Sequence, residues 1–231
     1  MMKAADLPTY YNICEILEHN LEHRGDKIAL LSENGSFTFR EVSEQVNRVG
    51  NALIRSGVQF GECVAILCPD RPEWVSVFFA TAKIGGVALG LNTLLKTDEY
   101  DYILKDARVK VLVVHDSLKA LVEPIIKKHD TLIKVITVTD NKSIKCTTFT
   151  HWIDGEKSEL DSATTHREDF CSLHYSSGTT GVPKGVLHMH KDYPLIAQLS
   201  GVDLFGIAEN CLLYTSPSPR DVEESRMPSS A

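Results

Sequence analysis

The chain has 231 residues, of which 43% are hydrophobic and 24% are charged, and its formal net charge is −7 at pH 7. This is an ordinary globular composition, and the length predicts one large domain or two smaller ones. The acidic balance excludes a broad electrostatic footprint for nucleic acid or for an anionic membrane. We therefore expect no nucleic-acid partner, and any phosphate-binding site must be local.

The first residues lack the continuous apolar run of a signal peptide, and no stretch approaches the length of a membrane span. The six cysteines are scattered, and Cys63 and Cys68 flank the apolar run "VAIL" of a predicted buried strand. We expect core thiols rather than disulfides or metal ligands, in the reducing cytoplasm.

The first strong pattern is the stretch "SFTFREVSEQVNRVGNALIRSG", which predicts an amphipathic helix. Thr38 and Glu41 form a T-x-x-E capping box at its start, and Gly57 ends it. Continuous apolar runs and helical patterns then alternate. Strands are predicted at 63–68, 87–91, 110–114 and 133–138, and helices at 72–86, from about Thr97 to Ala107, and at 117–129.

This alternation of buried strands and helices predicts an α/β fold, a doubly wound and mainly parallel sheet with helices on both faces. Residues 139–167 turn polar, and we expect a long surface connection there. Two further strands, "DFCSLHY" at 169–175 and "GVLHMH" at 185–190, flank a glycine-rich segment, which therefore joins two strands. A helical pattern resumes over 192–207.

The glycine-rich segment is "YSSGTTGVPKG", from Tyr175 to Gly185. Glycines let backbone N–H groups converge on an anion, hydroxyls add donors or a Mg²⁺ ligand, and the lysine adds positive charge. These are the parts of a polyphosphate cradle. The P-loop pattern G-x-x-x-x-G-K-[ST] does not fit, because Gly185 follows Lys184 and the next element is a strand. A solvated loop and a P-loop phosphotransferase are the alternatives.

The segment matches throughout the signature [YFST]-[ST]-S-G-[ST]-T-G-x-P-K-G, and the chain resembles the adenylate-forming, or AMP-binding, enzymes of the acyl-CoA synthetase type. The resemblance extends from about Tyr10 to Asn210, with Gly90 where proline is usual. The stretch "HMHKDYPLIAQLSGVDLFGIAEN" leans toward benzoate–CoA ligase, and medium-chain fatty acids are the alternative substrates.

The resemblance implies that ATP, Mg²⁺ and coenzyme A take part in a two-step reaction. A carboxylate attacks the α-phosphate of ATP and releases pyrophosphate, and the thiol of coenzyme A then displaces AMP to give a thioester. Lys184 and Thr180 are the implied catalytic residues, and Thr179 the implied Mg²⁺ ligand. The implied nucleotide-binding residues are Ser176, Ser177, Gly178, Thr179, Thr180, Gly181, Pro183, Lys184 and Gly185.

The resemblance also predicts the organisation of the chain. Residues 1–210 are expected to be an N-terminal part of an AMP-binding domain, which lacks the family's downstream glutamate, aspartate and lysine motifs. We therefore expect a fragment that is inactive by itself, with a non-catalytic phosphate-binding protein as the alternative. Residues 211–231 are polar and rich in serine and proline, and are expected to be a non-native or disordered tail.

Two histidines that follow the glycine-rich segment are open to a metal-binding interpretation. His188 and His190 could share one face of a strand, but no nearby carboxylate or cysteine completes a set of ligands. We expect structural roles for both, and we expect His174 to be a strand residue rather than a base.

Overall fold

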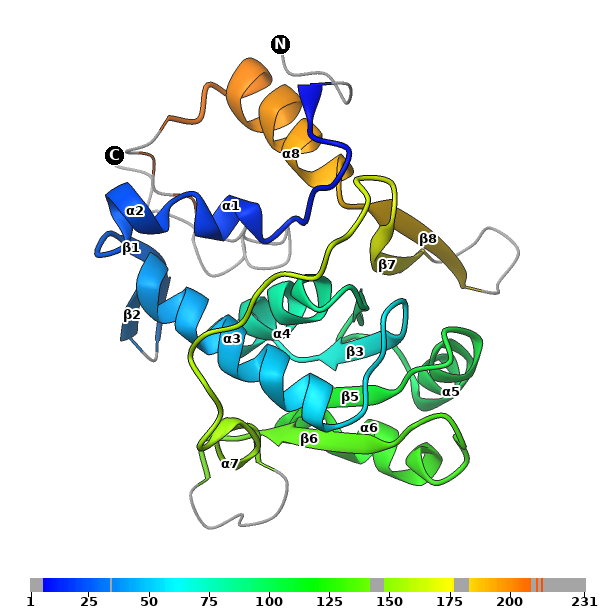
Figure 1. Cartoon of the computed structure of the whole chain (residues 1–231). Coiled ribbons are helices and arrows are strands. Elements are labelled where there is room, and N and C mark those ends of the chain that lie inside the picture. The colour runs from blue at the N-terminus through cyan, green and yellow to red at the C-terminus, as the bar shows by residue number, and fades with distance from the viewer. Residues whose placement is uncertain are drawn as a thin grey trace, which may run out of the picture.

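The computed structural model describes residues 6–33, 35–141, 148–176, 183–208, 211 and 213. A six-stranded sheet with the order β6-β5-β3-β4-β7-β8 forms its centre (Figure 1). All neighbouring strands pair in parallel except β7 and β8, which are antiparallel. The strands are β3 (Cys63–Leu67), β4 (Val87–Gly90), β5 (Val111–His115), β6 (Lys134–Val138), β7 (Phe170–Ser176) and β8 (Lys184–Met189). The predicted mainly parallel sheet is confirmed.

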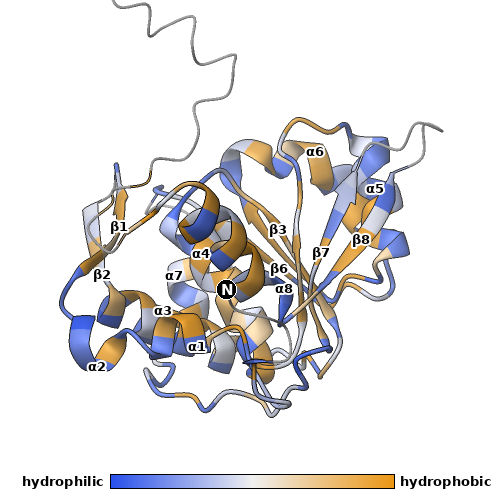
Figure 2. Ribbon diagram, turned by 90° about the horizontal axis from the view of Figure 1, so that it is seen from above, coloured by the Kyte–Doolittle hydropathy of each residue, from blue (hydrophilic) through white to orange (hydrophobic). Residues whose placement is uncertain are grey.

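Helices cover both faces of this sheet, as Figure 2 shows from above. On one face lie α3 (Phe39–Arg55), α4 (Pro72–Lys83) and α7 (Phe149–Ile153), and on the other α5 (Thr97–Asp106) and α6 (Asp116–Ile126). Side chains of a strand alternate between faces, so Val64 and Ile66 enter the first hydrophobic cluster while Ala65 and Leu67 enter the second. Burial on both faces explains why the strands are continuous apolar runs.

Local signals set the ends of the helices as predicted. The Thr38 N–H donates to Glu41 Oε2 at 2.8 Å, and the Glu41 N–H donates to Thr38 Oγ1 at 3.2 Å, which completes the capping box of α3. After α3, Gly57 adopts a φ of 90°, a conformation that glycine takes without strain. Pro72 is at the first turn of α4, where its missing N–H costs nothing.

Four short elements before α3 were not predicted, since the helices are too short to show a period and the strands are only partly buried. They are α1 (Glu15–Glu18), α2 (Leu21–Arg24), and an antiparallel hairpin of β1 (Ile28–Ser32) and β2 (Gly35–Thr38). At the other end, the helical pattern over 192–207 is realised as α8 (Asp192–Ile196) followed by a π-helix, Ala197–Leu204.

The expectation of a surface connection over 139–167 is wrong for its middle part. There α7 forms, with Phe149 5% and Trp152 4% exposed, and the indole N–H donates to Ser56 Oγ at 3.1 Å. The backbone carbonyls at 156–159 accept hydrogen bonds from Asn47, Arg48 and Asn51 of α3. The surrounding polar residues concealed an aromatic pair at i and i+3, which is enough to bury one face of a short helix.

The prediction of core thiols is confirmed for the buried residues Cys14, Cys63, Cys68 and Cys171. It is wrong for Cys211, which is exposed, and Cys146 lies outside the described residues. No helix in the described part of the chain is long and apolar enough to cross a membrane.

Candidate functional site

The glycine-rich segment joins β7 to β8, as predicted. Ser176, the last residue of β7, lies opposite Lys184, the first residue of β8, and both are exposed. Pro183 precedes Lys184 and is partly buried. Gly185 lies opposite Tyr175 and is exposed. The other predicted site residues, Ser177, Gly178, Thr179, Thr180 and Gly181, lie outside the described residues. The described ends of the segment therefore offer one hydroxyl and one ammonium group.

A cavity of about 560 Å³ lies beside this hairpin, at the carboxyl ends of β3, β4 and β7. This edge of an open α/β sheet is where ligands bind in such folds. The walls of the cavity include Asp70, Trp74, Asn92, Thr93, His174 and Tyr175. Only the last two were near the predicted site. The others follow β3 and β4 closely, and their position just after buried strands is the signal that could have identified them.

Aromatic rings form one side of the cavity. Trp74 stacks on Phe78 with ring centroids 5.3 Å apart, and Phe78 meets Tyr193 of α8 edge-on at 5.6 Å. Phe78 belongs to the hydrophobic core, and Trp74 both packs against that core and lines the cavity. A Cβ at Gly90 would lie 3.1 Å from Trp74 Cζ2, so this glycine makes room for the indole.

His174 belongs to β7, as predicted, and joins a small polar cluster behind the cavity. Its Nε2 lies 3.3 Å from the Tyr193 hydroxyl, which is 2.6 Å from Ser172 Oγ. Burial, and then the neighbouring His188, lower the pKa of His174. The imidazole is therefore held neutral by its surroundings at neutral pH.

His188 and His190 contact different partners. His190 directly follows β8 and is fully buried, and its Nδ1 accepts the Ile13 N–H at 3.0 Å. His188 lies 3.6 Å from Asp192 through its Nδ1. Within the described ranges, no group of three or more histidine, cysteine, aspartate or glutamate side chains could hold a metal ion.

A smaller cavity of about 90 Å³ lies on the α5 side of the hairpin, where Tyr175, Ser176 and Pro183 meet residues of β4 and α5. Here the Tyr175 hydroxyl donates to Asp106 Oδ2 at 2.5 Å. Burial, and then this hydrogen bond, raise the pKa of Tyr175. The base of the hairpin is thus tied to the end of a helix that sequence reasoning did not connect with the site.

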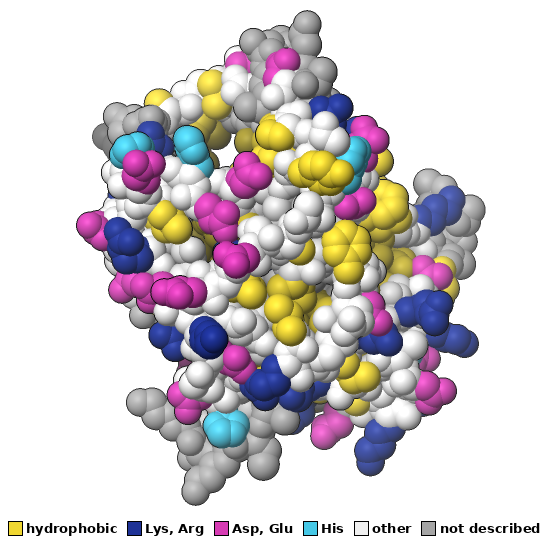
Figure 3. All heavy atoms as spheres, viewed as in Figure 1, with side chains coloured by type: hydrophobic (Ala, Val, Ile, Leu, Met, Phe, Trp, Pro, Cys, Tyr) yellow, Lys and Arg dark blue, Asp and Glu magenta, His cyan; other side chains and the backbone are white. Residues whose placement is uncertain are grey.

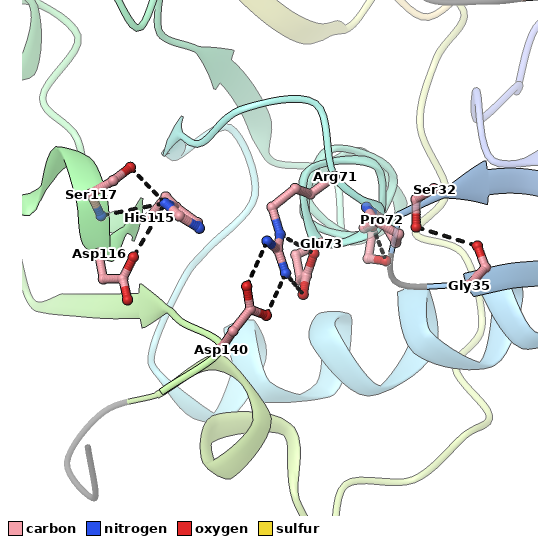
Figure 4. Close-up of polar contacts among 10 residues, drawn as sticks. Ser32, Gly35, Arg71, Pro72, Glu73, His115, Asp116, Ser117 and Asp140 are labelled. Atoms are coloured by element: carbon pink, nitrogen blue, oxygen red, sulfur yellow. Dashed lines mark hydrogen bonds and ion pairs between the residues drawn. The ribbon is translucent and has the colours of Figure 1, made fainter. Parts of the chain in front are cut away.

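Further along the same edge, Figure 4 shows two groups of polar contacts, one around Arg71 between β3 and α4 and one around His115 at the end of β5. Arg71, which precedes α4, holds Asp140 with nitrogen–oxygen distances of 2.8 and 3.1 Å, and its Nε also bonds Glu73 at 3.2 Å. The Nδ1 of His115 lies 2.8 Å from Ser117 Oγ. These contacts fix the loops at the carboxyl edge of the sheet.

Apolar side chains are exposed at the hairpin and on the helix that follows it, and Figure 3 shows hydrophobic side chains on this part of the molecule. Val186 and Leu187 of the edge strand β8 are 47% and 45% exposed, and Leu199 and Val202 are 45% and 48% exposed. The hairpin therefore combines a polar end, where the predicted phosphate-binding residues begin, with an apolar outer edge.

The fold and the hairpin together define a doubly wound α/β protein with a glycine-rich loop at the carboxyl edge of its sheet. The family described as AMP-binding enzyme matches residues 17–222. The chain therefore belongs to the AMP-binding enzyme family, and the resemblance seen in the sequence is confirmed.

Two relatives of this chain are named as CoA ligases. The chain is 33% identical over 193 residues to a 3-hydroxybenzoate/4-hydroxybenzoate–CoA ligase of Thauera aromatica, covering 83% of this chain and 37% of the relative. It is 31% identical over 218 residues to the benzoate–CoA ligase of the same organism, covering 92% and 40%. The chain thus spans about 40% of the length of these curated relatives.

Solved structures of CoA ligases are also similar to this chain. The anthranilate CoA ligase AuaEII, crystallised with anthranoyl-AMP, is 50% identical with a TM-score of 0.86, covering 89% of this chain and 40% of that one. A benzoate CoA ligase from Burkholderia xenovorans LB400 is 25% identical with a TM-score of 0.78, covering 87% and 39%.

Proposed function

We propose that the chain supplies the phosphate-binding part of an ATP-dependent carboxylate–CoA ligase that works in the cytoplasm. The observation that carries the proposal is the hairpin, whose ends place Ser176 opposite Lys184 at the carboxyl edge of the sheet, beside the cavity of about 560 Å³. At that edge, a hydroxyl and an ammonium group can both donate hydrogen bonds to the phosphate oxygens of a nucleotide. The relatives favour a ligase over a non-catalytic phosphate-binding protein.

In this reaction the carboxylate of the acid attacks the α-phosphate of ATP, and pyrophosphate leaves. Carboxylate oxygen is a weak nucleophile and the triphosphate is strongly anionic, so positioning and charge neutralisation supply most of the catalysis. Lys184 would neutralise phosphate charge, and the loop from Ser176 to Gly185, Thr180 included, would hold the phosphate oxygens. Coenzyme A then takes the acyl group as a thioester.

Magnesium would be held mainly by the nucleotide. In sites that bind nucleotides, this ion typically binds through one or two protein oxygens together with substrate phosphates. Thr179 is the side chain that we propose as its protein ligand.

For the acid we propose an aromatic carboxylate. The similar proteins are named for anthranilate, benzoate and hydroxybenzoate, all of which carry the carboxylate on an aromatic ring. Medium-chain fatty acids are the alternative, and a panel of acids containing both classes separates the two.

The organisation predicted from the sequence becomes part of the proposal. We propose that residues 1–210 belong to the AMP-binding domain, that residues 211–231 form a tail, and that this 231-residue chain does not complete thioester formation alone. Limited proteolysis with mass spectrometry tests the division, because a disordered tail is cut before the domain.

The function is tested by calorimetric titration of the chain with Mg-ATP, followed by an assay of pyrophosphate release with anthranilate, benzoate and octanoate. We expect binding, and at least about tenfold weaker binding for Lys184→Ala, since a charged contact to phosphate is lost. Lys191→Ala is the matched control, because Lys191 lies past the hairpin and pairs with Glu168 at 2.7 Å. Failure of the wild-type chain to bind Mg-ATP would overturn the nucleotide-binding role, and thioester formation would overturn the predicted inactivity.

A further inference from the structure

The contact between Tyr175 and Asp106 joins the predicted phosphate-binding hairpin to a helix that ends 69 residues earlier in the chain. Tyr175 is the last residue but one of β7, and Asp106 is the last residue of α5. The phenol donates to a carboxylate oxygen at 2.5 Å, the short distance typical of a charge-assisted hydrogen bond. The contact lies at the surface, where Asp106 is exposed and Tyr175 is partly buried, and its short length marks a direct hydrogen bond between β7 and α5.

Asp106 is a poor residue for the position that it occupies in α5. The carboxyl end of a helix carries partial negative charge, so a carboxylate there is unfavourable, and lysine, arginine or histidine is preferred. A residue that is unfavourable at its position in an otherwise regular helix points to a role outside that helix. The role that the geometry offers Asp106 is to accept the Tyr175 hydroxyl.

Helix α5, which carries Asp106, is anchored in the hydrophobic core. Tyr100 of α5 is fully buried, and its hydroxyl donates to the Asn92 carbonyl at 2.8 Å. Ile103 and Leu104 are also buried, in the hydrophobic cluster against which Tyr175 packs. Asp106 therefore projects from a rigid support, so it can restrain the residue that it binds.

The near end reaches both strands of the hairpin. Tyr175 lies opposite Gly185, and a Cβ at Gly185 would be 3.3 Å from Tyr175 Cζ. The ring thus lies over the glycine of the edge strand, where it replaces the side chain that glycine lacks. A restraint on the phenol consequently acts on β7 directly and on β8 through the covered glycine.

We propose that Asp106 is a positioning residue of the phosphate-binding hairpin, which holds the ends of the loop, Ser176 and Lys184, in register through the hydroxyl of Tyr175. It touches neither nucleotide nor acid. Its effect on nucleotide affinity rests on the proposed function, whereas its effect on the hairpin does not.

The experiment compares the full chain with Tyr175→Phe, Asp106→Ala, Asp106→Asn and the double variant Tyr175→Phe/Asp106→Ala. Asparagine keeps an oxygen that accepts the phenol but removes the charge, so it separates the hydrogen bond from electrostatic repulsion of phosphate. Tyr102→Phe is the matched control, since it removes another phenol, 39% exposed, from α5. The two readouts are amide hydrogen exchange in β7 and β8 without nucleotide, and the dissociation constant for Mg-ATP.

We expect exchange in the hairpin to rise about fivefold in Tyr175→Phe and in Asp106→Ala, which corresponds to the loss of one hydrogen bond. The double variant should be no worse than either single variant, and Asp106→Asn should lie within about twofold of the wild type. The dissociation constant for Mg-ATP should likewise rise in Tyr175→Phe, Asp106→Ala and the double variant, and should stay close to the wild-type value in Asp106→Asn. Tyr102→Phe should change neither readout.

Unchanged hairpin exchange in both single variants overturns the proposal. So does tighter Mg-ATP binding by Asp106→Asn and Asp106→Ala alike, because that result identifies Asp106 as a repulsive charge. If the wild-type chain binds no Mg-ATP, the proposed function is what fails, and hairpin exchange alone then decides the role of Asp106.

Discussion

The imidazole of His190 accepts the backbone N–H of Ile13 at 3.0 Å, although 177 residues separate them in the chain. This bond joins the N-terminal segment to the residue that directly follows β8. Because Nδ1 is the acceptor, the proton of the neutral ring is on Nε2. That atom is buried and has no hydrogen-bond partner in the part of the chain that the structure describes.

His190 should make the chain less stable in mild acid. Burial lowers its pKa from 6.5 to about 4, and the opposing effect of Asp169 is smaller. As the pH falls from about 6.5 to about 4, the unfolded chain takes up a proton that the folded chain refuses, so the free energy of unfolding falls over this window, by about 3 kcal/mol in total. Urea unfolding at a series of pH values measures it.

The matched variant is His190→Asn, whose amide oxygen can take the place of Nδ1 without titrating. We expect the difference in unfolding free energy between wild type and variant to depend on pH only within this window. A difference that is constant from pH 7 to pH 4 would contradict the prediction.

Gly185→Ala should destabilise the chain by about 1–2 kcal/mol through overpacking. An added Cβ would lie 3.0 Å from Leu173 Cδ1 and 3.3 Å from Tyr175 Cζ, and Leu173 is buried between β7 and the helices. Gly201→Ala is the control, because its Cβ would make an ordinary contact at 3.6 Å with Ile207. Thermal unfolding of both variants checks this, and equal midpoints would count against close packing over Gly185.

Trp152→Ala should cost about 3–5 kcal/mol, the usual range for deleting a buried aromatic side chain. The indole is 4% exposed, packs against Phe149 with ring centroids 6.1 Å apart, and bonds Ser56. Exposed His151 provides the neighbouring control, and His151→Ala should change stability by less than about 0.5 kcal/mol. Denaturant unfolding compares them. If Trp152→Ala changes the free energy of unfolding only slightly, the segment behaves as the surface connection that its polarity predicts.

Cys211 should react with a thiol reagent before the buried cysteines do. Burial raises the pKa of Cys63, Cys68 and Cys171 to about 12, and it also raises that of Cys14, so these thiols are both covered and protonated. Mass spectrometry after brief labelling of the native chain identifies the modified residue. Labelling of Cys63 as fast as Cys211 would show that the core opens readily.

The sequence predicted the elements that repeat a strong pattern. The capping box of α3, the proline that starts α4, and the apolar strands β3 to β6 are local signals, and each is confirmed. The hairpin of β1 and β2 was missed because its strands are partly exposed and lack the continuous apolar runs of β3 to β6, and α7 was missed because five residues cannot display a helical period. Trp152 was hidden among polar neighbours, and only tertiary packing reveals it.

The residues of the site likewise fall into those that could be predicted from the sequence and those that could not. The motif from Tyr175 to Gly185 could be recognised as a unit because its residues are contiguous. Asp70, Asn92 and Asp106 come from segments that reach the hairpin only through the strand order, with β7 beside β4. Nothing within each segment signals that neighbour, so only the folded sheet could bring these residues to the motif.

The strand order also has a consequence for synthesis and folding. Strand β3 pairs with β4 and with β5, and β5 pairs with β6, so each of these pairings spans less of the chain than the pairing of β7 with β4. Strand β7 pairs with β4 across the whole intervening chain, and contacts between distant residues form slowly. As the chain leaves the ribosome, the first four strands can assemble while one side of β4 stays open. The hairpin of β7 and β8 is then the last part of the sheet to be set in place.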